Sequence, residues 1–140
     1  QAQPLVRYRT GDIVTITDTD LCQCSRTSWR FRIVGRTDDM FNVRGINVFP
    51  TAISEVLAAA GDLSSGQFRI TLRGPGPYDR IEMKVEAASG LGEREFDGAS
   101  AALEERIRER IGAPAAIAMV PHLSLPRTDG KTSWVERTTE

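Results

Sequence analysis

The sequence predicts an α+β fold in which a short β segment precedes one mixed unit. Segments in which polar and apolar residues alternate predict strands, and they flank two segments whose apolar residues recur at helical spacing. From Asp38 onward these segments follow the order β, α, β, β, α, β. That is the order of a ferredoxin-like sandwich, in which two helices cover one face of a sheet. A chain of 140 residues is long enough for one such domain.

Residues 1–37 lie outside this order and are expected to form a small β segment that leads into it. Its strands are expected at residues 5–9, 13–17 and 29–35. In the last of these strands, Trp29, Phe31 and Ile33 fall on one face, and the arginines between them point the other way. The polar stretch that precedes this strand predicts turns.

The second unit begins with a strand that is expected over residues 39–49, although Arg44 and Gly45 interrupt its pattern. Pro50 suits the first position of a helix, where its missing N–H leaves no bond unmade. This helix is expected to stop at Gly61. Its apolar stripe consists of Ile53, Val56, Leu57 and Ala60.

The remaining elements are a hairpin, a second helix and a final strand. The strands are expected at residues 67–74, 80–88 and 116–126. The second helix is expected from about Phe96 to Ile111, with Glu104 paired to Arg108 one turn later. Its apolar stripe consists of Leu103, Ile107 and Ile111. The polar residues 127–140 are expected to form turns.

The composition excludes some classes of partner. The chain is 40% hydrophobic and 26% charged, and 18 basic against 19 acidic residues give a net charge of −1. Nucleic-acid binding usually leaves a basic excess, so no such partner is expected. No apolar run approaches the ~18 residues of a membrane span and no signal peptide is visible, so a cytoplasmic location without membrane contact is expected. The first residue is Gln1 rather than Met, which fits a piece of a longer chain.

Cys22 and Cys24 are the two cysteines of the chain and form a C-x-C pair. A disulfide between such close neighbours is strained, so reduced thiols are expected. A structural zinc site needs four ligands, and the single histidine, His122, lies far away in sequence. Two interpretations remain open, namely ordinary thiols near a turn or half of a zinc site that ligands from outside this chain complete.

Three short motifs carry groups that suit nucleotide and anion recognition. In YRTGD, Asp12 follows a glycine turn, and a carboxylate placed there can accept both hydroxyls of a ribose. In GRTDD, Arg36 supplies a planar fork of donors beside Asp38 and Asp39. In LPRTDGK, Lys131 supplies a mobile point charge for a phosphate or a carboxylate. Each motif taken alone is also typical of a solvated turn.

Together, in this order and at these separations, the three motifs resemble those of the adenylate-forming enzymes, such as acyl- and aryl-CoA ligases and luciferases. RGINVFP and the C-x-C segment are similar to the phenylacetate-CoA ligase branch, and the resemblance runs from about Val6 to Lys131. It implies that the chain is the C-terminal portion of a ligase. Residues 1–37 would then end a large N-terminal adenylation domain, and residues 38–140 would form a mobile C-terminal domain that works against it.

The resemblance also implies the reaction. In this family a carboxylate attacks ATP, bound with Mg²⁺, and forms an acyl-adenylate and pyrophosphate. The C-terminal domain then rotates, and the thiol of CoA attacks the adenylate. ATP, CoA and an aryl or acyl carboxylate are therefore the expected ligands. The phosphate loop and the acyl pocket of the family lie in the N-terminal domain, so this fragment is expected to be inactive alone. The sequence predicts no oligomeric state.

The same resemblance implies roles for single residues. Asp12 and Arg36 match residues that bind the ribose and phosphate region of ATP, and Asp38 matches the hinge, whose backbone absorbs the rotation. Lys131 matches the lysine that bridges the substrate carboxylate and the α-phosphate during adenylation. The residues implied to lie along the path of CoA are Arg44, Gly45 and Asn47.

The match is incomplete at one end, and two alternatives stay open. After Lys131 the branch usually continues with arginine, valine and aspartate, whereas this chain has Trp134, Val135 and Glu136. One alternative is an enzyme like the coenzyme F390 synthetases, which adenylates a different acceptor. The other is a non-catalytic ferredoxin-like regulatory or binding module. The module accounts for the order of elements but not for the joint presence of the three motifs.

Overall fold

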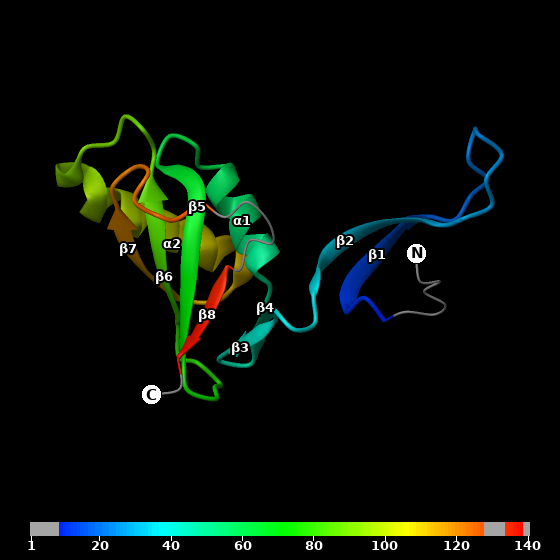
Figure 1. Cartoon of the computed structure of the whole chain (residues 1–140), viewed down its shortest axis with the longest axis horizontal. Helices are drawn as coiled ribbons and strands as arrows, with labels where there is room; N and C mark the ends of the chain where they lie inside the picture. The colour runs from blue at the N-terminus through cyan, green and yellow to red at the C-terminus, as the bar shows by residue number, and fades with distance from the viewer. Residues whose placement is uncertain (1–8, 128–133, 139–140) are drawn as a thin grey trace, which may run out of the picture.

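The computed structural model describes residues 9–127 and 134–138 and has the α+β architecture that the sequence predicts. Figure 1 shows a layered body from which a two-stranded hairpin projects. The strands are β1 (Asp12–Asp18), β2 (Arg30–Arg36), β3 (Phe41–Val43), β4 (Ile46–Val48), β5 (Ser64–Arg73), β6 (Ile81–Ala87), β7 (Ala115–Val120) and β8 (Val135–Thr138). The helices are α1 (Pro50–Ala58) and α2 (Phe96–Ile111), with a short 3-10 turn, Glu93–Glu95, before α2.

The body is built on a mixed four-stranded sheet with the order β7-β6-β5-β8. β5 and β6 form the predicted antiparallel hairpin, whereas β7 runs parallel to β6 and β8 runs parallel to β5. The two helices pack against one face of this sheet (Figure 1), because the apolar residues of β5 and β6 alternate toward them. The main core residues are Phe68, Ile70, Leu72, Ile81, Met83, Val85, Ile53, Leu57, Leu103 and Ile107.

Both helices begin and end near the predicted signals. α1 starts at Pro50, after an extended Phe49, and it ends at Ala58. α2 ends at Gly112, whose φ of 83° lies in the left-handed region that glycine adopts without strain. The N–H of Gly112 donates to the carbonyl of Arg108 at 2.9 Å and closes the last turn. Within the described ranges, no helix is long and apolar enough to cross a membrane.

The expected pairing along α2 is wrong in detail. Arg108 pairs with Glu105 instead of Glu104. Glu104 turns toward the sheet, where its Oε1 accepts the backbone N–H of Ile117 at 2.8 Å. This bond ties the middle of α2 to β7, so a residue that the helical pattern placed in a surface ion pair serves the packing of helix on sheet.

The strand expected over residues 39–49 is instead a tight hairpin of β3 and β4. Arg44 and Gly45 form its turn with φ values of 50° and 87°, and a two-residue turn of type I′ requires a positive φ at both positions. Asn42 holds the turn, because its Oδ1 accepts the N–H of Gly45 at 2.9 Å and its Nδ2 donates to Asn47 at 3.0 Å. The glycine that seemed to interrupt a strand is therefore the turn itself.

The C-terminal tail contributes an edge strand, β8, where the sequence predicted only turns. Val135 pairs with Ile70 of β5, and the N–H of Ile70 donates to the carbonyl of Trp134 at 2.8 Å. The indole of Trp134 stacks on Phe68 with ring centroids 5.8 Å apart. Together these contacts fix the chain at Trp134 against the central strand of the sheet.

The last predicted strand is also shorter than expected. β7 ends at Val120, and Pro121, which has no N–H for a further ladder bond, follows it. Residues 121–127 then lie over the face of the sheet opposite the helices, where the backbone of Leu125 and the side chain of Arg127 reach Glu86 of β6.

The projecting hairpin of β1 and β2 keeps its apolar face exposed. The register places Val14 opposite Ile33 and Ile16 opposite Phe31, so these side chains are cross-strand neighbours. Phe31 is 60% exposed and Ile33 is 57% exposed. The alternation of β2 is thus confirmed, but no described part of the chain covers this face.

Candidate functional site

Three of the predicted site residues meet where the projecting hairpin joins the body. Asp12 opens β1 and Arg36 closes β2, and the antiparallel register makes them direct partners. Arg36 Nη1 lies 3.3 Å from Asp12 Oδ1, and Arg36 Nη2 lies 3.0 Å from Asp38 Oδ2. The hydrogen bond and charge of Asp38, and then the charge of Asp12, raise the pKa of Arg36, so the guanidinium stays charged.

Two hydrogen bonds between Thr37 and Gly11 hold the backbone around this cluster. Gly11 has a φ of 77°, and its carbonyl accepts the N–H of Thr37 at 2.8 Å and the hydroxyl of Thr37 at 3.2 Å. A Cβ on Gly11 would approach Thr37, Arg36 and Asp38 at 3.4 to 3.6 Å. The cluster therefore offers two carboxylates and a guanidinium on a defined backbone, and it suits a ligand that has both hydroxyls and an anionic group.

Asp38 lies in the turn between the hairpin and the body. Its side chain pairs with Arg36 of β2, whereas its backbone carbonyl accepts a bond of 3.3 Å from Arg137 of β8. A residue with contacts on both sides of a junction is well placed to register a movement of one side against the other.

The residues predicted to meet CoA lie together on the β3–β4 hairpin, beyond this turn. Arg44 and Gly45 form the hairpin turn, and the side chain of Asn47 is held by Asn42. Arg44 also borders a surface pocket of about 520 Å³. The pocket is lined by Arg44, Thr71, Arg73, Tyr78, Asp79, Arg80, Glu82, Pro114 and Ala115. The arginines suit a phosphate-bearing ligand, although Arg73 already pairs with Glu82, 3.4 Å away, in the same lining.

The two cysteines occupy an exposed loop after β1. Cys24 Sγ lies 3.1 Å from Cys22 Sγ, and Ser25, with a φ of 63°, tightens the turn by donating its N–H to the carbonyl of Cys22. The backbone N–H of Cys24, followed by its thiol, lowers the pKa of Cys22 and favours the thiolate. In the part of the chain that the structure describes, no cluster of three metal-binding side chains includes them.

Lys131, predicted to act in catalysis, lies outside the described residues. The segments on either side of it are described, and one of them holds a cluster that the sequence patterns missed. Glu86 occupies a position of β6 that alternation assigns to the polar face, yet its side chain is fully buried. Neither its spacing nor its neighbours in sequence distinguish it from Glu82, which stays partly exposed on the same strand.

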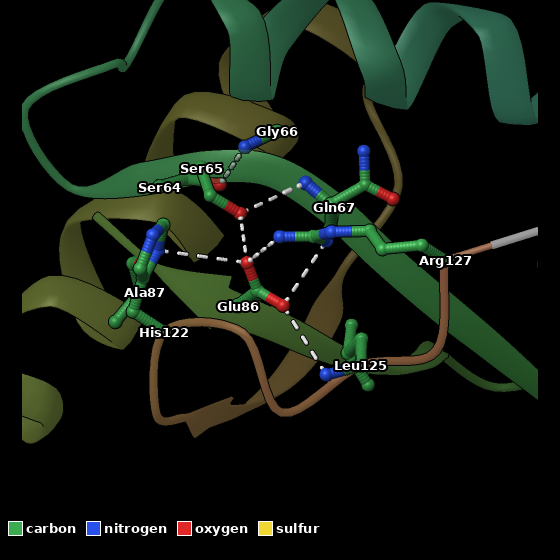
Figure 2. A network of polar contacts seen from close by, with 9 residues as sticks. All are labelled: Ser64, Ser65, Gly66, Gln67, Glu86, Ala87, His122, Leu125 and Arg127. Carbon is green, nitrogen blue, oxygen red and sulfur yellow. Dashed lines mark hydrogen bonds and ion pairs between the residues drawn. The ribbon is translucent and has the colours of Figure 1, made fainter. Parts of the chain in front are cut away.

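Figure 2 shows how the Glu86 carboxylate is surrounded. Arg127 donates hydrogen bonds to both of its oxygens, with Nη2 2.7 Å from Oε1 and Nη1 3.2 Å from Oε2. The hydroxyl of Ser65 donates to Oε1 at 2.7 Å, and the backbone N–H of Leu125 donates to Oε2 at 3.2 Å. His122 Nδ1 lies 3.6 Å from Oε1 and 3.1 Å from the carbonyl of Ala87.

Together, the hydrogen-bond donors around Glu86 change its pKa more than its burial does. Burial alone would raise the pKa of the carboxyl group, because it removes water from the charged form. The hydrogen bonds from Arg127, Ser65 and the backbone of Leu125 act in the opposite direction, and together they lower the pKa of Glu86 from 4.5 to about 2. Glu86 is therefore an ionised group at neutral pH that is enclosed on all sides.

Comparison with known proteins places this arrangement in a family. Residues 45–137, more than half of the chain, match the AMP-binding enzyme C-terminal domain family. The chain belongs to this family. The matched range begins at Gly45, the second residue of the β3–β4 turn, and includes both helices, the Glu86 cluster and β8 up to Arg137. The resemblance drawn from the sequence motifs is confirmed.

Curated relatives of the domain are phenylacetate-coenzyme A ligases. The one from Thermus thermophilus is 35% identical over 146 residues, which cover 93% of this chain and 32% of that ligase. The one from Escherichia coli K12 is 32% identical over 139 residues and has coverages of 96% and 31%. The chain thus spans about a third of the length of the curated relatives it matches.

Solved structures agree with the predicted fold class. A 2-hydroxyisobutyryl-CoA ligase in a postadenylation state with 2-HIB-AMP matches this domain with a TM-score of 0.83 and 28% identity, over 96% of this chain and 29% of that one. The same ligase with 2-HIB-AMP and CoA in its thioesterification state gives a TM-score of 0.64, again at 28% identity, over 98% of this chain and 29% of that one.

Proposed function

We propose that this chain is the C-terminal part of an AMP-forming ligase that activates an aryl carboxylate with ATP and transfers it to CoA. The observation that carries the proposal is the ionic bridge from Asp12 through Arg36 to Asp38, because it unites the expected nucleotide and hinge residues at one junction. Residues 1–37 would end the N-terminal domain, and residues 38–140 would form the mobile domain. The identity to phenylacetate-coenzyme A ligases favours an arylacetate as the acid.

In this proposal Asp12 and Arg36 serve the nucleotide. The carboxylate of Asp12 accepts the ribose hydroxyls, and the guanidinium of Arg36 faces the ribose and phosphate region, with Mg²⁺ bound to the phosphates of ATP. Arg36 also orients Asp12, since the two side chains lie 3.3 Å apart on paired strands. The complex of the 2-hydroxyisobutyryl-CoA ligase with 2-HIB-AMP supports an adenylate as a ligand of the longer protein.

Asp38 is the proposed hinge. The two states of the 2-hydroxyisobutyryl-CoA ligase match this chain at equal identity and nearly equal coverage, yet the TM-score falls from 0.83 to 0.64. Such a fall at constant coverage supports a different arrangement of the same parts in that ligase. A rotation about Asp38 would produce it here, because this residue contacts β2 with its side chain and β8 with its carbonyl.

The β3–β4 turn is the proposed contact with CoA. Gly45 presents a backbone without a Cβ, and nothing lies within 4 Å of the place where a Cβ would stand, so a narrow pantetheine arm can approach. Arg44, at the mouth of the arginine-lined pocket, would face the phosphates of CoA. Asn47 would act beside them, held in orientation by Asn42.

The β1–β2 hairpin has an exposed apolar face that the rest of the proposed N-terminal domain could cover. The exposed face of the β1–β2 hairpin presents cross-strand apolar pairs that no described part of this chain covers. Packing this face against a further β layer would remove it from water, which is the ordinary way in which such a face is stabilised. We therefore propose that the rest of the N-terminal domain, which precedes residues 1–37, packs on this face.

The proposal is tested by acid-dependent ATP–pyrophosphate exchange. The longer protein that contains this chain is expected to catalyse exchange with phenylacetate and related aryl acids, and the 140-residue chain alone is expected to catalyse none. Aliphatic acids of similar size serve as the control for the substrate class. Exchange by the isolated chain, or a longer protein with no exchange for any acid in the panel, would contradict the proposal.

We also propose that Cys22 and Cys24 supply two ligands of a structural zinc site in the longer protein. Two thiolates on one turn fit such a site, although their 3.1 Å separation must widen to about 3.8 Å, the spacing of two sulfurs on a tetrahedral zinc ion. Metal analysis should find about one zinc per longer protein, and the variant with Cys22→Ser and Cys24→Ser should lose it. Equal zinc content in both proteins would overturn the proposal.

A further inference from the structure

A set of contacts joins the projecting hairpin to the first helix of the body. β2 ends before Asp38 and α1 begins after it, so every contact between these two elements spans the proposed hinge. The contacts join Val34 with Thr51, Gly35 with Phe49, and Arg32 with Glu55. Together they determine how the body is oriented against the hairpin in this structure.

The first contact starts from a bulge in β2. The register of the hairpin shifts between Ile13 and Val14 of β1, and the shift leaves Val34 of β2 without an opposite residue in the described pairing. A bulge of this kind bends its strand and takes a backbone group out of the ladder. The carbonyl of Val34 instead accepts a hydrogen bond from the hydroxyl of Thr51, the second residue of α1.

The second contact lies beside the bulge, where the ring of Phe49 covers the backbone of Gly35. Gly35 is buried although it belongs to the projecting hairpin. A Cβ at this position would lie only 2.8 Å from Cδ1 of Phe49, so the close approach requires glycine. Phe49 directly precedes α1. The ring therefore determines how closely β2 and the start of α1 can approach.

The third contact is weaker. Arg32 Nη1 lies 3.9 Å from Glu55 Oε1, and their side chains are 69% and 65% exposed. Water and salt screen such a pair, and it contributes little. We call the two stronger contacts the hinge latch, which consists of Val34, Gly35, Phe49 and Thr51.

The hinge latch belongs to one arrangement of the two parts. This chain agrees with the postadenylation state of the 2-hydroxyisobutyryl-CoA ligase at a TM-score of 0.83 and with its thioesterification state at 0.64. The two sides of the latch lie before and after Asp38 in the chain, so a rotation about Asp38 would separate them. Contacts that form in only one of two arrangements shift the equilibrium toward it.

We infer that Thr51 and Phe49 are positioning residues that hold the body in the arrangement used for adenylation and lose their contacts when CoA attacks. The inference rests on the proposed function and adds to it residues that do not touch the reacting atoms. A hydrogen bond of ordinary strength changes an equilibrium roughly 2- to 10-fold. Such an effect is large enough to bias the two arrangements and small enough to leave the rotation possible.

The first test uses Thr51→Val in the longer ligase and measures the two half-reactions separately. Valine keeps the shape of the side chain and removes the donor to Val34. Each half-reaction depends on the population of its own arrangement, so the ratio of ATP–pyrophosphate exchange to thioester formation from supplied acyl-adenylate should fall roughly 2- to 10-fold. Thr51→Ser keeps the hydroxyl and should recover most of the ratio. A general loss of stability would lower both half-reactions and leave their ratio unchanged.

The second test fixes the hinge latch with a disulfide. A Cβ on Gly35 would lie 3.5 Å from Cβ of Phe49, at the lower end of the spacing found in disulfides. In the longer ligase with Gly35→Cys and Phe49→Cys, oxidised glutathione takes two electrons and two protons from the thiols, whose sulfurs then bond. The linked protein should keep exchange and lose at least about tenfold in thioester formation, and reduction should restore the loss. Each single variant, treated in the same way, should show no such change.

Mass spectrometry of the joined peptides confirms the link, and the half-reactions then decide the inference. Equal losses in both half-reactions by Thr51→Val, an unchanged ratio, or full thioester formation by the linked protein would overturn the hinge latch. A longer protein without exchange for any acid would instead overturn the proposed function. Where the cysteine variant fails to fold or to form the link, the comparison of Thr51→Val with Thr51→Ser decides alone.

Discussion

Lys131→Ala in the longer ligase is expected to lower acid-dependent ATP–pyrophosphate exchange by about 100- to 1,000-fold. The physical reason is electrostatic. A carboxylate and the α-phosphate of ATP are both anions, and the ammonium group offsets the repulsion that grows as they approach. Thioester formation from supplied acyl-adenylate should be largely retained, because that step joins a thiol to an activated carbonyl and brings no second anion to the lysine.

The chain contains its own control for this substitution. It has two lysines, and Lys84 lies exposed on β6, on the face of the sheet away from the helices. Lys84→Ala makes the same change in charge and should leave both half-reactions near the level of the unmodified ligase. A similar loss of exchange in both variants would show that net charge matters rather than the position of Lys131.

Acidification is expected to remove about 3 kcal/mol of folding stability through Glu86 alone. The folded-state pKa of this group is about 2, below its ordinary value of 4.5, so the folded form prefers the ionised carboxylate. The contribution is therefore fully present above about pH 4.5 and is lost as the pH falls through 4.5 toward 2. Urea unfolding of the 140-residue chain at pH 7, 4.5 and 3 measures the loss, of which about 2 kcal/mol is expected by pH 3.

Glu86→Gln should flatten this dependence, because the amide does not titrate. The difference in unfolding free energy between the unmodified chain and the variant should be largest near neutral pH and should shrink as the pH falls toward 2. Glu82→Gln is the matched control on the same strand, since Glu82 pairs with Arg73 at the surface, where an ion pair contributes little. Parallel pH profiles for the unmodified chain and Glu86→Gln would refute the assignment.

At neutral pH the Glu86 carboxylate is fully charged, and the arrangement in Figure 2 is the relevant one.

Much of the fold was predictable because it depends on neighbours in sequence. Pro50 and Gly112 mark helix ends through their own backbone chemistry, and the alternation in β5 and β6 predicts a hairpin without reference to the rest of the chain. The β3–β4 hairpin was mistaken for one strand, although Arg44 and Gly45 carried the signal of a two-residue turn. β8 was missed because four residues at a sheet edge acquire their structure from β5.

The candidate site, like the fold, was predicted from the sequence only in part. The motifs identified Asp12 and Arg36 as chemically suited to a nucleotide, and the family resemblance implied that Asp38 is the hinge. Only the register of β1 with β2 brings Asp12 and Arg36 within 3.3 Å. Lys131 was identified by the same motifs, and its role stays a prediction.

The sequence by itself determined the class of fold, the helix boundaries and the groups available for chemistry, since these follow from residue type and local periodicity. The tertiary structure alone decided the environment of Glu86. A period of two places its side chain on a polar face, and a stretch some forty residues away then covers that face and brings Arg127 to it. Burial depends on contacts between distant segments, which no local pattern records, and here it turns an ordinary surface glutamate into a buried, ionised anchor.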